Sequence, residues 1–299
     1  MKTNSLPGSQ DGTEEPEQNR DVNALFSSFR LDQTSYRTFN RHRNPKTPER
    51  EGIPHPESQH KDRVQIGIFS PMGGSGKSTL STSLGSILWQ LGRRVLLVDT
   101  SPWHVLAFHY GATSVRPGIR SFFAPGGQEQ AVHILAWDQS DAGMPDVNNF
   151  AATTPLDCVL FDLGGVAGEL LLSYLRECDI VLVPLLPDPS AVRLAEAAKT
   201  FLSKLQPSPA RVMFVINQMD DSLVAKEVQA NLAQALCEQL LSTPIYRQPE
   251  VQQALSNGVV LPFYAPKAQA VSVCNEIARW LKVPEQSAVS KNQQRWCER

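Results

Sequence analysis

The sequence lacks the apolar runs and the cysteine spacing that define several common classes of protein. None of its apolar runs approaches the roughly twenty residues that span a bilayer, and its polar, acidic first residues contain no apolar segment of a signal peptide. The five cysteines are scattered and form no C-x-x-C pair. This spacing argues against a disulfide framework and against a zinc or iron–sulfur site. We therefore expect a cytoplasmic protein with reduced thiols and, at most, a peripheral association with membranes.

A strong excess of either charge is also missing. The 28 lysine and arginine residues nearly balance the 30 aspartate and glutamate residues, so the formal net charge is −2. Because a protein that coats nucleic acid needs a basic surface, we do not expect nucleic acid as a general partner. With 41% hydrophobic residues over 299 positions, the chain can bury a substantial core. This favours one α/β domain with tails.

The composition divides the chain into three predicted parts. Residues 1–62 are rich in Gln, Asn, Ser, Pro and Glu and are predicted to be largely disordered, because they bury too little apolar surface to offset chain entropy. A short apolar motif at 21–39 interrupts them, and fits either a helix that folds back on its own domain or a docking motif that folds on a partner. Residues 63–283 are predicted to form the folded domain, and 284–299 a flexible tail.

Within the folded part, apolar strands alternate with helical patterns, which predicts an α/β fold with a doubly wound, mostly parallel sheet. The expected strands are 64–69, 94–98, 134–137, 157–161, 179–184, 211–216 and a short one near Ile245. The expected helices are 78–91, 190–205, 223–240 and 268–281. Polar residues that follow several strands mark the carboxyl edge of the sheet, where ligands bind in such folds.

A glycine-rich stretch between the first predicted strand and helix has the context of a phosphate-binding loop. It reads Ser70-Pro71-Met72-Gly73-Gly74-Ser75-Gly76-Lys77-Ser78-Thr79. Glycines allow backbone N–H groups to turn inward around an anion, and the helix N-terminus adds its dipole. Lys77 supplies a positive charge, and Ser78 supplies a hydroxyl for Mg²⁺. The predicted nucleotide-binding residues are Gly73, Gly74, Ser75, Gly76, Lys77, Ser78 and Thr79.

The loop departs from the common pattern, because Pro71 stands where a glycine is usual and has no N–H to donate. The run from Gly73 to Ser78 instead resembles the deviant P-loop of the ParA/MinD superfamily, and residues 64–281 resemble these ATPases as a whole. Two softer motifs, residues 98–103 and the run from Ile245 to Ala270, are most similar to the BcsQ (YhjQ) branch encoded with bacterial cellulose synthase. The resemblance implies a P-loop NTPase fold of the SIMIBI, MinD-like type.

Membership of this superfamily also implies cofactors and partners. The expected cofactors are ATP and Mg²⁺, and the expected assembly is a homodimer that sandwiches ATP. Membership of the branch implies a scaffold or regulatory subunit recruited peripherally to the inner-membrane cellulose secretion complex. Its expected partners are cellulose synthase subunits and a small co-folding subunit. The alternative is a ParA-like cargo-positioning ATPase that acts on DNA or on a membrane surface.

Three strand ends carry further predicted site residues. Asp162, followed by Gly164 and Gly165, is a Walker-B-like carboxylate suited to holding Mg²⁺ through water, with a capping residue in a turn as the alternative. The resemblance places Asp99 in the switch I segment and gives Asn217 the role of contacting adenine, with a turn asparagine as the alternative. The predicted catalytic residues are Lys77, Asp99 and Asp162. The predicted metal ligands are Ser78, Asp99 and Asp162.

Two positions differ from the family's pattern. The family's signature lysine is replaced by Met72, which we expect to face the place where a partner's signature lysine would contact phosphate. The second acid of the family's Asp-x-Asp-Pro motif is replaced by Ser101, and an uncharged hydroxyl is a weaker orienter of water. Loss of the lysine charge is expected to weaken stabilisation of the transition state. We therefore predict that ATP binding is retained and that hydrolysis is slow or absent.

Overall fold

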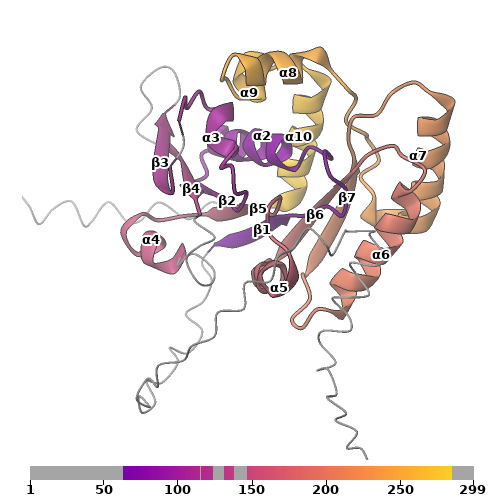
Figure 1. The fold of residues 1–299 in the computed structure, drawn as a ribbon, viewed down its shortest axis with the longest axis horizontal. Helices are drawn as coiled ribbons and strands as arrows, with labels where there is room; N and C mark the ends of the chain where they lie inside the picture. Colours follow the sequence, from indigo (N-terminus) through magenta and orange to yellow (C-terminus); the bar gives the residue numbers. More distant parts are fainter. Residues whose placement is uncertain (1–62, 115, 124–130, 138–146, 285–299) are drawn as a thin grey trace, which may run out of the picture. The chain divides into compact units, whose positions relative to one another are not determined.

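The computed structural model describes residues 63–114, 116–123, 131–137 and 147–284 (Figure 1). The predictions made for the motif at 21–39 and for the C-terminal tail lie outside these residues. Within the described part of the chain, no helix is both long enough and apolar enough to cross a bilayer.

The described strands form one seven-stranded sheet in the order β3-β4-β2-β5-β1-β6-β7. Each neighbouring pair is parallel except β3 and β4, which run antiparallel at one edge. The bounds are β1 (Val64–Ile68), β2 (Val95–Asp99), β3 (Gly118–Phe123), β4 (Ala131–Ala136), β5 (Cys158–Asp162), β6 (Ile180–Leu185) and β7 (Arg211–Ile216). The predicted mostly parallel, doubly wound sheet is confirmed. The antiparallel edge strand β3 was not predicted, because its side chains are largely exposed and show no apolar pattern.

Helices cover both faces of the sheet (Figure 1). The bounds are α2 (Lys77–Gln90), α3 (Leu106–His109), α4 (Val147–Thr153), α5 (Gly168–Glu177), α6 (Ala191–Lys204), α7 (Leu223–Leu236), α8 (Pro249–Ser256), α9 (Leu261–Tyr264) and α10 (Gln269–Leu281), with a 3₁₀ turn η2 (Cys237–Gln239) after α7. The figure shows α2 and α10 on one face and α5 and α6 on the other. This double cover explains why β2, β5 and β6 are buried at every residue and are nearly continuous apolar runs.

Helix α2 is almost wholly buried even though it contains several serines and threonines. Two of these hydroxyls bond back to its own backbone: Ser81 Oγ donates to the Lys77 carbonyl and Thr82 Oγ1 to the Ser78 carbonyl. A buried hydroxyl that has a partner avoids most of the cost of leaving water. The helix that follows the loop can therefore lie deep in the domain.

Two elements differ from the sequence prediction near the carboxyl end. The strand expected near Ile245 is only an isolated bridge between Met219 and Tyr246. The Tyr246 N–H donates to the side chain of Gln269 instead of to a neighbouring strand, at 3.1 Å. The helix expected at 223–240 ends at Leu236, because the next residue, Cys237, adopts a positive φ of 49°.

The strand register brings the predicted acidic residues to one edge of the sheet. Asp162 at the end of β5 is paired with Ile68 on one side and with Asp99 on the other. Ile68 is the last residue of β1, which leads directly into the glycine-rich loop. The loop and the two aspartates therefore meet at the carboxyl ends of three adjacent strands.

Candidate functional site

The loop between β1 and α2 turns through two glycines in the left-handed region. The φ angles are 69° at Gly74 and 86° at Gly76, which a residue with a Cβ adopts only with strain. Space also excludes a side chain at Gly76, because a Cβ there would lie 2.2 Å from Nδ2 of Asn217. Both requirements identify Gly76 as the residue on which the entry into α2 depends.

Neighbouring strand ends hold the loop in place through its backbone. On the β6 side, Ser70 Oγ donates to the Pro184 carbonyl at 2.6 Å and accepts the Met72 N–H at 3.1 Å. On the β7 side, Asn217 Nδ2 donates to the Ser75 carbonyl at 2.7 Å. The Ser70 side chain and the Ser75 carbonyl thus fix the two ends of the loop to neighbouring strands.

Lys77, Ser78 and Asp162 form the polar centre of the site. Ser78 Oγ donates to Asp162 Oδ2 at 2.6 Å, and Lys77 Nζ donates to the Met72 carbonyl at 3.4 Å. Burial lowers the pKa of Lys77, an effect that the charge of Asp162 opposes. Burial raises the pKa of Asp162 to about 7, with the nearby Asp99 adding to the rise and the Ser78 hydrogen bond and Lys77 opposing it. Burial therefore disfavours the charged forms of both Lys77 and Asp162, and each charge partly offsets this effect on the other.

The donor set fits Mg²⁺ bound together with a phosphate. Asp162 Oδ1 is buried and has no hydrogen-bond partner within the described residues, which is costly unless a ligand supplies one. The Ser78 hydroxyl lies beside the same carboxylate. The described part of the chain contains no cluster of three or more His, Cys, Asp or Glu side chains that could hold a metal alone. Water and phosphate oxygens would have to complete the ligand shell, as is usual for Mg²⁺.

Asp99, the other predicted catalytic and metal residue, lies beside this centre, but its carboxylate accepts hydrogen bonds from the segment that follows it. Its Oδ1 accepts bonds from the N–H and the Oγ of Ser101, at 3.0 and 2.7 Å. Its Oδ2 accepts from the Leu106 N–H at 2.7 Å, and the residue is fully buried. In this structure Asp99 anchors the segment 101–106, and its predicted part in metal binding or catalysis stays a prediction.

The two positions that differ from the family's pattern are also turned inward. Ser101 Oγ donates to Asp99 and accepts from the Val105 N–H at 3.3 Å, so its hydroxyl is used in both directions. The Met72 side chain is only 9% exposed. The apolar side chain is thus buried within its own domain, and the expected place of Met72 in a nucleotide-bound dimer stays a prediction.

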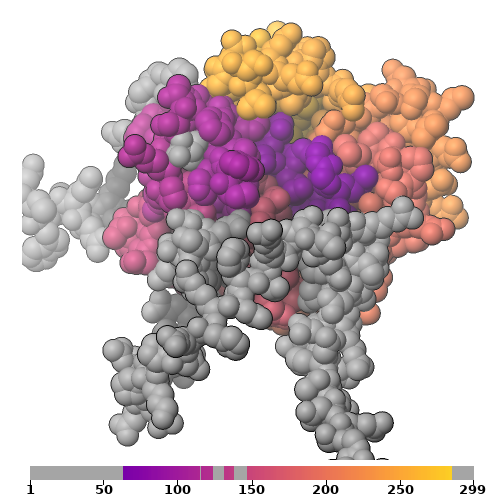
Figure 2. All heavy atoms as spheres, in the orientation of Figure 1, coloured from indigo at the N-terminus to yellow at the C-terminus, as the bar shows by residue number. Residues whose placement is uncertain are grey.

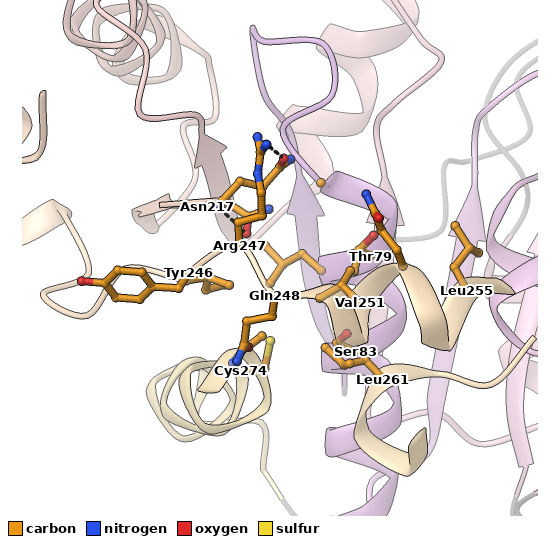
Figure 3. Close-up of a pocket in the computed structure, with 16 residues that line it drawn as sticks. Thr79, Ser83, Asn217, Tyr246, Arg247, Gln248, Val251, Leu255, Leu261 and Cys274 are labelled. Atoms are coloured by element: carbon orange, nitrogen blue, oxygen red, sulfur yellow. Dashed lines mark hydrogen bonds between the residues drawn. The ribbon is translucent and has the colours of Figure 1, made fainter. Parts of the chain in front are cut away.

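A cavity of about 410 Å³ opens beside the loop, at the start of α2 (Figure 3). Its walls come from α2, the end of β7, the segment 245–248, α8 and α10. The predicted residues Gly76, Thr79 and Asn217 line it. Asn217 Oδ1 accepts the Gln218 N–H at 3.0 Å while its Nδ2 holds the loop. Asn217 thus lines the cavity and also holds the phosphate loop through the Ser75 carbonyl.

Two residues of this cavity, Gln218 and Arg247, were missed by the sequence analysis. Gln218 Nε2 donates to the Gly74 carbonyl at 2.7 Å, and Arg247 Nη2 donates to Gln218 Oε1 at 3.4 Å. The position of Gln218 directly after Asn217 was the available signal. No pattern in the sequence links Arg247 to the loop, because the link runs through Gln218, which is 29 residues from Arg247 and 144 residues from Gly74.

The loop and cavity are accessible from one side of the domain. Gly73 and Gly74 of the loop are exposed, and Figure 2 shows indigo atoms at the surface below the yellow carboxyl-terminal helices and beside the orange region. A ligand can therefore reach the loop without opening the core.

The fold and this site define a P-loop nucleotide-binding protein. The chain belongs to the CobQ/CobB/MinD/ParA nucleotide binding domain family, whose model matches residues 66–261.

Individual relatives span most of the domain. The chain is 26% identical over 246 residues to the chromosome-partitioning ATPase Soj of Thermus thermophilus, an alignment that covers 75% of this chain and 97% of Soj. Its structure is similar to that of the septum site-determining protein MinD of Pyrococcus horikoshii complexed with Mg-ADP, with a TM-score of 0.57, 19% identity and coverage of 73% and 96% of the two chains. A ParA family ATPase from Chlorobium tepidum matches with a TM-score of 0.59, 17% identity and coverage of 73% and 98%. These structural likenesses confirm the MinD-like fold.

Proposed function

We propose that the protein is an ATP-binding, dimer-forming scaffold or regulatory subunit with slow or absent ATP hydrolysis. The observation that carries the proposal is the centre formed by Lys77, Ser78 and Asp162, where a buried carboxylate oxygen has no partner among the described residues. An anionic ligand that brings its own Mg²⁺ supplies a partner for that oxygen and for the Lys77 ammonium. The Mg-ADP bound to the P. horikoshii protein supports a ligand of this class.

The parts of the site correspond to the parts of a nucleotide. The loop from Gly73 to Thr79 and the amino end of α2 suit the phosphates, because the backbone N–H groups and the helix dipole favour negative charge. The cavity beside Asn217 suits the base and ribose. Ser78 and Asp162 are the residues that would hold Mg²⁺, which supplies charge neutralisation for the phosphates.

The proposed slow hydrolysis rests on the segment that follows β2. A charged carboxylate orients an attacking water better than a neutral hydroxyl does. Here the Asp99 carboxylate accepts three hydrogen bonds from its own segment, and the uncharged Ser101 hydroxyl donates to Asp99 and accepts from the Val105 N–H. Met72 adds no charge near the phosphates. Purified protein should therefore bind ATP tightly while its turnover stays far below that of active partition ATPases. A turnover equal to theirs would contradict the proposal.

The biological setting that we propose is the cellulose secretion complex at the inner membrane, with cellulose synthase subunits and a small co-folding subunit as partners. The BcsQ-like motifs of residues 98–103 and 245–270 support this setting. The test is genetic: removal of the gene should abolish cellulose output, the wild-type gene should restore it, and Lys77→Ala should not. Normal cellulose output in the deletion strain would exclude this setting and leave the nucleotide-binding proposal standing.

A second candidate is a cargo-positioning ATPase that acts on DNA or on a membrane surface. The match to Soj over 97% of that protein's length favours it. ATP-dependent, salt-sensitive retention of the purified protein on non-specific DNA, or on anionic vesicles, would support this second function. If the purified protein binds ATP but is retained neither on DNA nor on anionic vesicles, the result would favour the scaffold function.

A further inference from the structure

The cavity beside the phosphate loop contains one residue with a formal charge, and that residue is bonded to the loop. Of the sixteen residues that line the cavity, Arg247 is the one charged side chain, and no lining residue is acidic. Its guanidinium donates to Gln218 Oε1, while the other end of the same amide donates to the Gly74 carbonyl. One amide group thus connects Arg247 to the loop. Figure 3 shows the Arg247 side chain extending along the cavity wall toward Asn217, the residue that bonds the next loop carbonyl.

The backbone around Arg247 is fixed, although its side chain is exposed. The Arg247 N–H donates to the Met219 carbonyl at 2.9 Å, and the Met219 N–H donates to the Ile245 carbonyl at 2.9 Å. The next side chain, Gln248, accepts the Ala270 N–H at the start of α10 at 2.9 Å. A fixed backbone with an exposed charged end is suited to meeting a ligand, because little of the chain has to be ordered on binding.

Arg247 also keeps capacity for an anion. It forms no salt bridge within the described residues. The nearby Asp220 has a lowered pKa, mainly because of hydrogen bonds from Ser222. The charge of Arg247 makes the smallest contribution to this pKa shift. Its bond to Gln218 is long, at 3.4 Å, and uses one of five N–H groups of the guanidinium. The remaining donors are free to bind an oxyanion, for which the planar guanidinium is well suited.

We propose that Arg247 is a phosphate-binding residue, which supplies from the same chain a second positive charge, in addition to that of Lys77, for the bound nucleotide. Gln218 orients it through its bond to Gly74. This inference rests on the proposed nucleotide binding and adds a prediction of its own. The affinity contributed by Arg247 should depend on the phosphates of the ligand and not on its base.

The test measures dissociation constants by calorimetry for Mg-ATP, Mg-ADP and adenosine on the full-length protein. Arg247→Gln is expected to weaken ATP and ADP binding about tenfold, because a charged hydrogen-bond donor to an oxyanion is lost. Adenosine binding should change by less than about twofold. Arg247→Lys should retain most of the ATP affinity, since it keeps the charge. Arg193→Gln, an exposed arginine of α6 outside the cavity, is the matched control and should behave as the wild type.

Raising the salt concentration gives a second measurement. ATP affinity of the wild type should fall more steeply with salt than that of Arg247→Gln, because screening weakens a charge–charge contact. Equal ATP affinity in the wild type and Arg247→Gln would overturn the inference, and so would an equal loss for adenosine, which would assign Arg247 to the shape of the base cavity. A wild-type protein that binds neither ATP nor ADP would instead overturn the proposed function.

Discussion

Two neighbouring regions at the carboxyl edge of the sheet differ in how their polar groups are bonded. In the loop region, the buried Asp162 keeps an oxygen without a partner in the described chain, and Lys77 has only a long contact to a carbonyl. In the segment that follows β2, the Asp99 carboxylate and the Ser101 hydroxyl are bonded to one another and to the backbone. The first region therefore has a buried polar atom that a ligand can satisfy, whereas the polar groups of the second are bonded within their own segment.

This difference in hydrogen bonding affects nucleotide binding and nucleotide hydrolysis in opposite ways. A group that lacks a partner gains from a ligand, because its desolvation has already occurred in the folded protein. A group that already accepts several hydrogen bonds from its own chain has less capacity left to orient a water molecule. The structure therefore suits a protein whose nucleotide acts as a bound component more than as a substrate.

The largest expected effect concerns the loop region. Lys77→Ala should weaken ATP binding about a hundredfold, or about 2.7 kcal/mol, because the phosphates lose a partly desolvated positive charge. Calorimetry measures the change. Lys199→Ala, an exposed lysine of α6, is the control and should leave the affinity unchanged. An affinity in Lys77→Ala within threefold of the wild type would remove the basis for treating the loop as the binding region.

The next effect concerns α3, which follows β2 along the chain, and the pH dependence of the free energy of unfolding. His109 ends α3 and is 9% exposed, and burial lowers its pKa from 6.5 to about 4. The unfolded chain therefore takes up a proton near pH 6.5 and the folded chain only near pH 4, so stability falls as the pH falls between these values. At pH 5 the loss should be about 2 kcal/mol.

Denaturant unfolding at pH 7.5 and pH 5 checks this expectation. The variant His109→Asn should lose less stability than the wild type between the two pH values. The same loss in both proteins would show that His109 is not the group responsible.

A smaller effect is expected at the carboxylate of the loop region. Asp162→Asn removes the anionic ligand for Mg²⁺, so the gain in ATP affinity caused by Mg²⁺ should fall about tenfold. Titration of ATP with and without Mg²⁺ measures that gain. Asp221→Asn, an exposed aspartate after β7, is the control. An undiminished Mg²⁺ effect in Asp162→Asn would assign the metal to other ligands.

The smallest expected effect concerns Ser101, in the segment that follows β2. Ser101→Ala breaks the hydroxyl's bonds to Asp99 and Val105 and should lower the free energy of unfolding by about 1 kcal/mol. The slow ATP turnover should not change, because the hydroxyl orients the chain and not a water molecule. Ser203→Ala, whose exposed hydroxyl bonds only within α6, should be nearly neutral. A clear drop in turnover at unchanged stability would place Ser101 in the reaction.

Much of the fold could be predicted because the central strands are buried on both faces. That burial requires continuous apolar runs such as β2, β5 and β6, and these runs are visible in the sequence. The exposed edge strand β3 and the short helices α3 and α9 have no comparable pattern, since neighbouring elements decide their conformation. The loop could be predicted because the left-handed turn at Gly76 leaves few alternatives to glycine.

By itself, the sequence determined a phosphate loop after a buried strand, with Lys77 and Ser78 at the start of a helix and Asp162 at a strand end. These features depend on local backbone geometry and on the apolar pattern, both of which short stretches of chain encode. The tertiary structure decided that Met72 is turned inward and that Arg247 reaches the loop through Gln218. Those facts depend on which side chains meet after distant segments pack, and on which hydrogen bonds remain available once they have met.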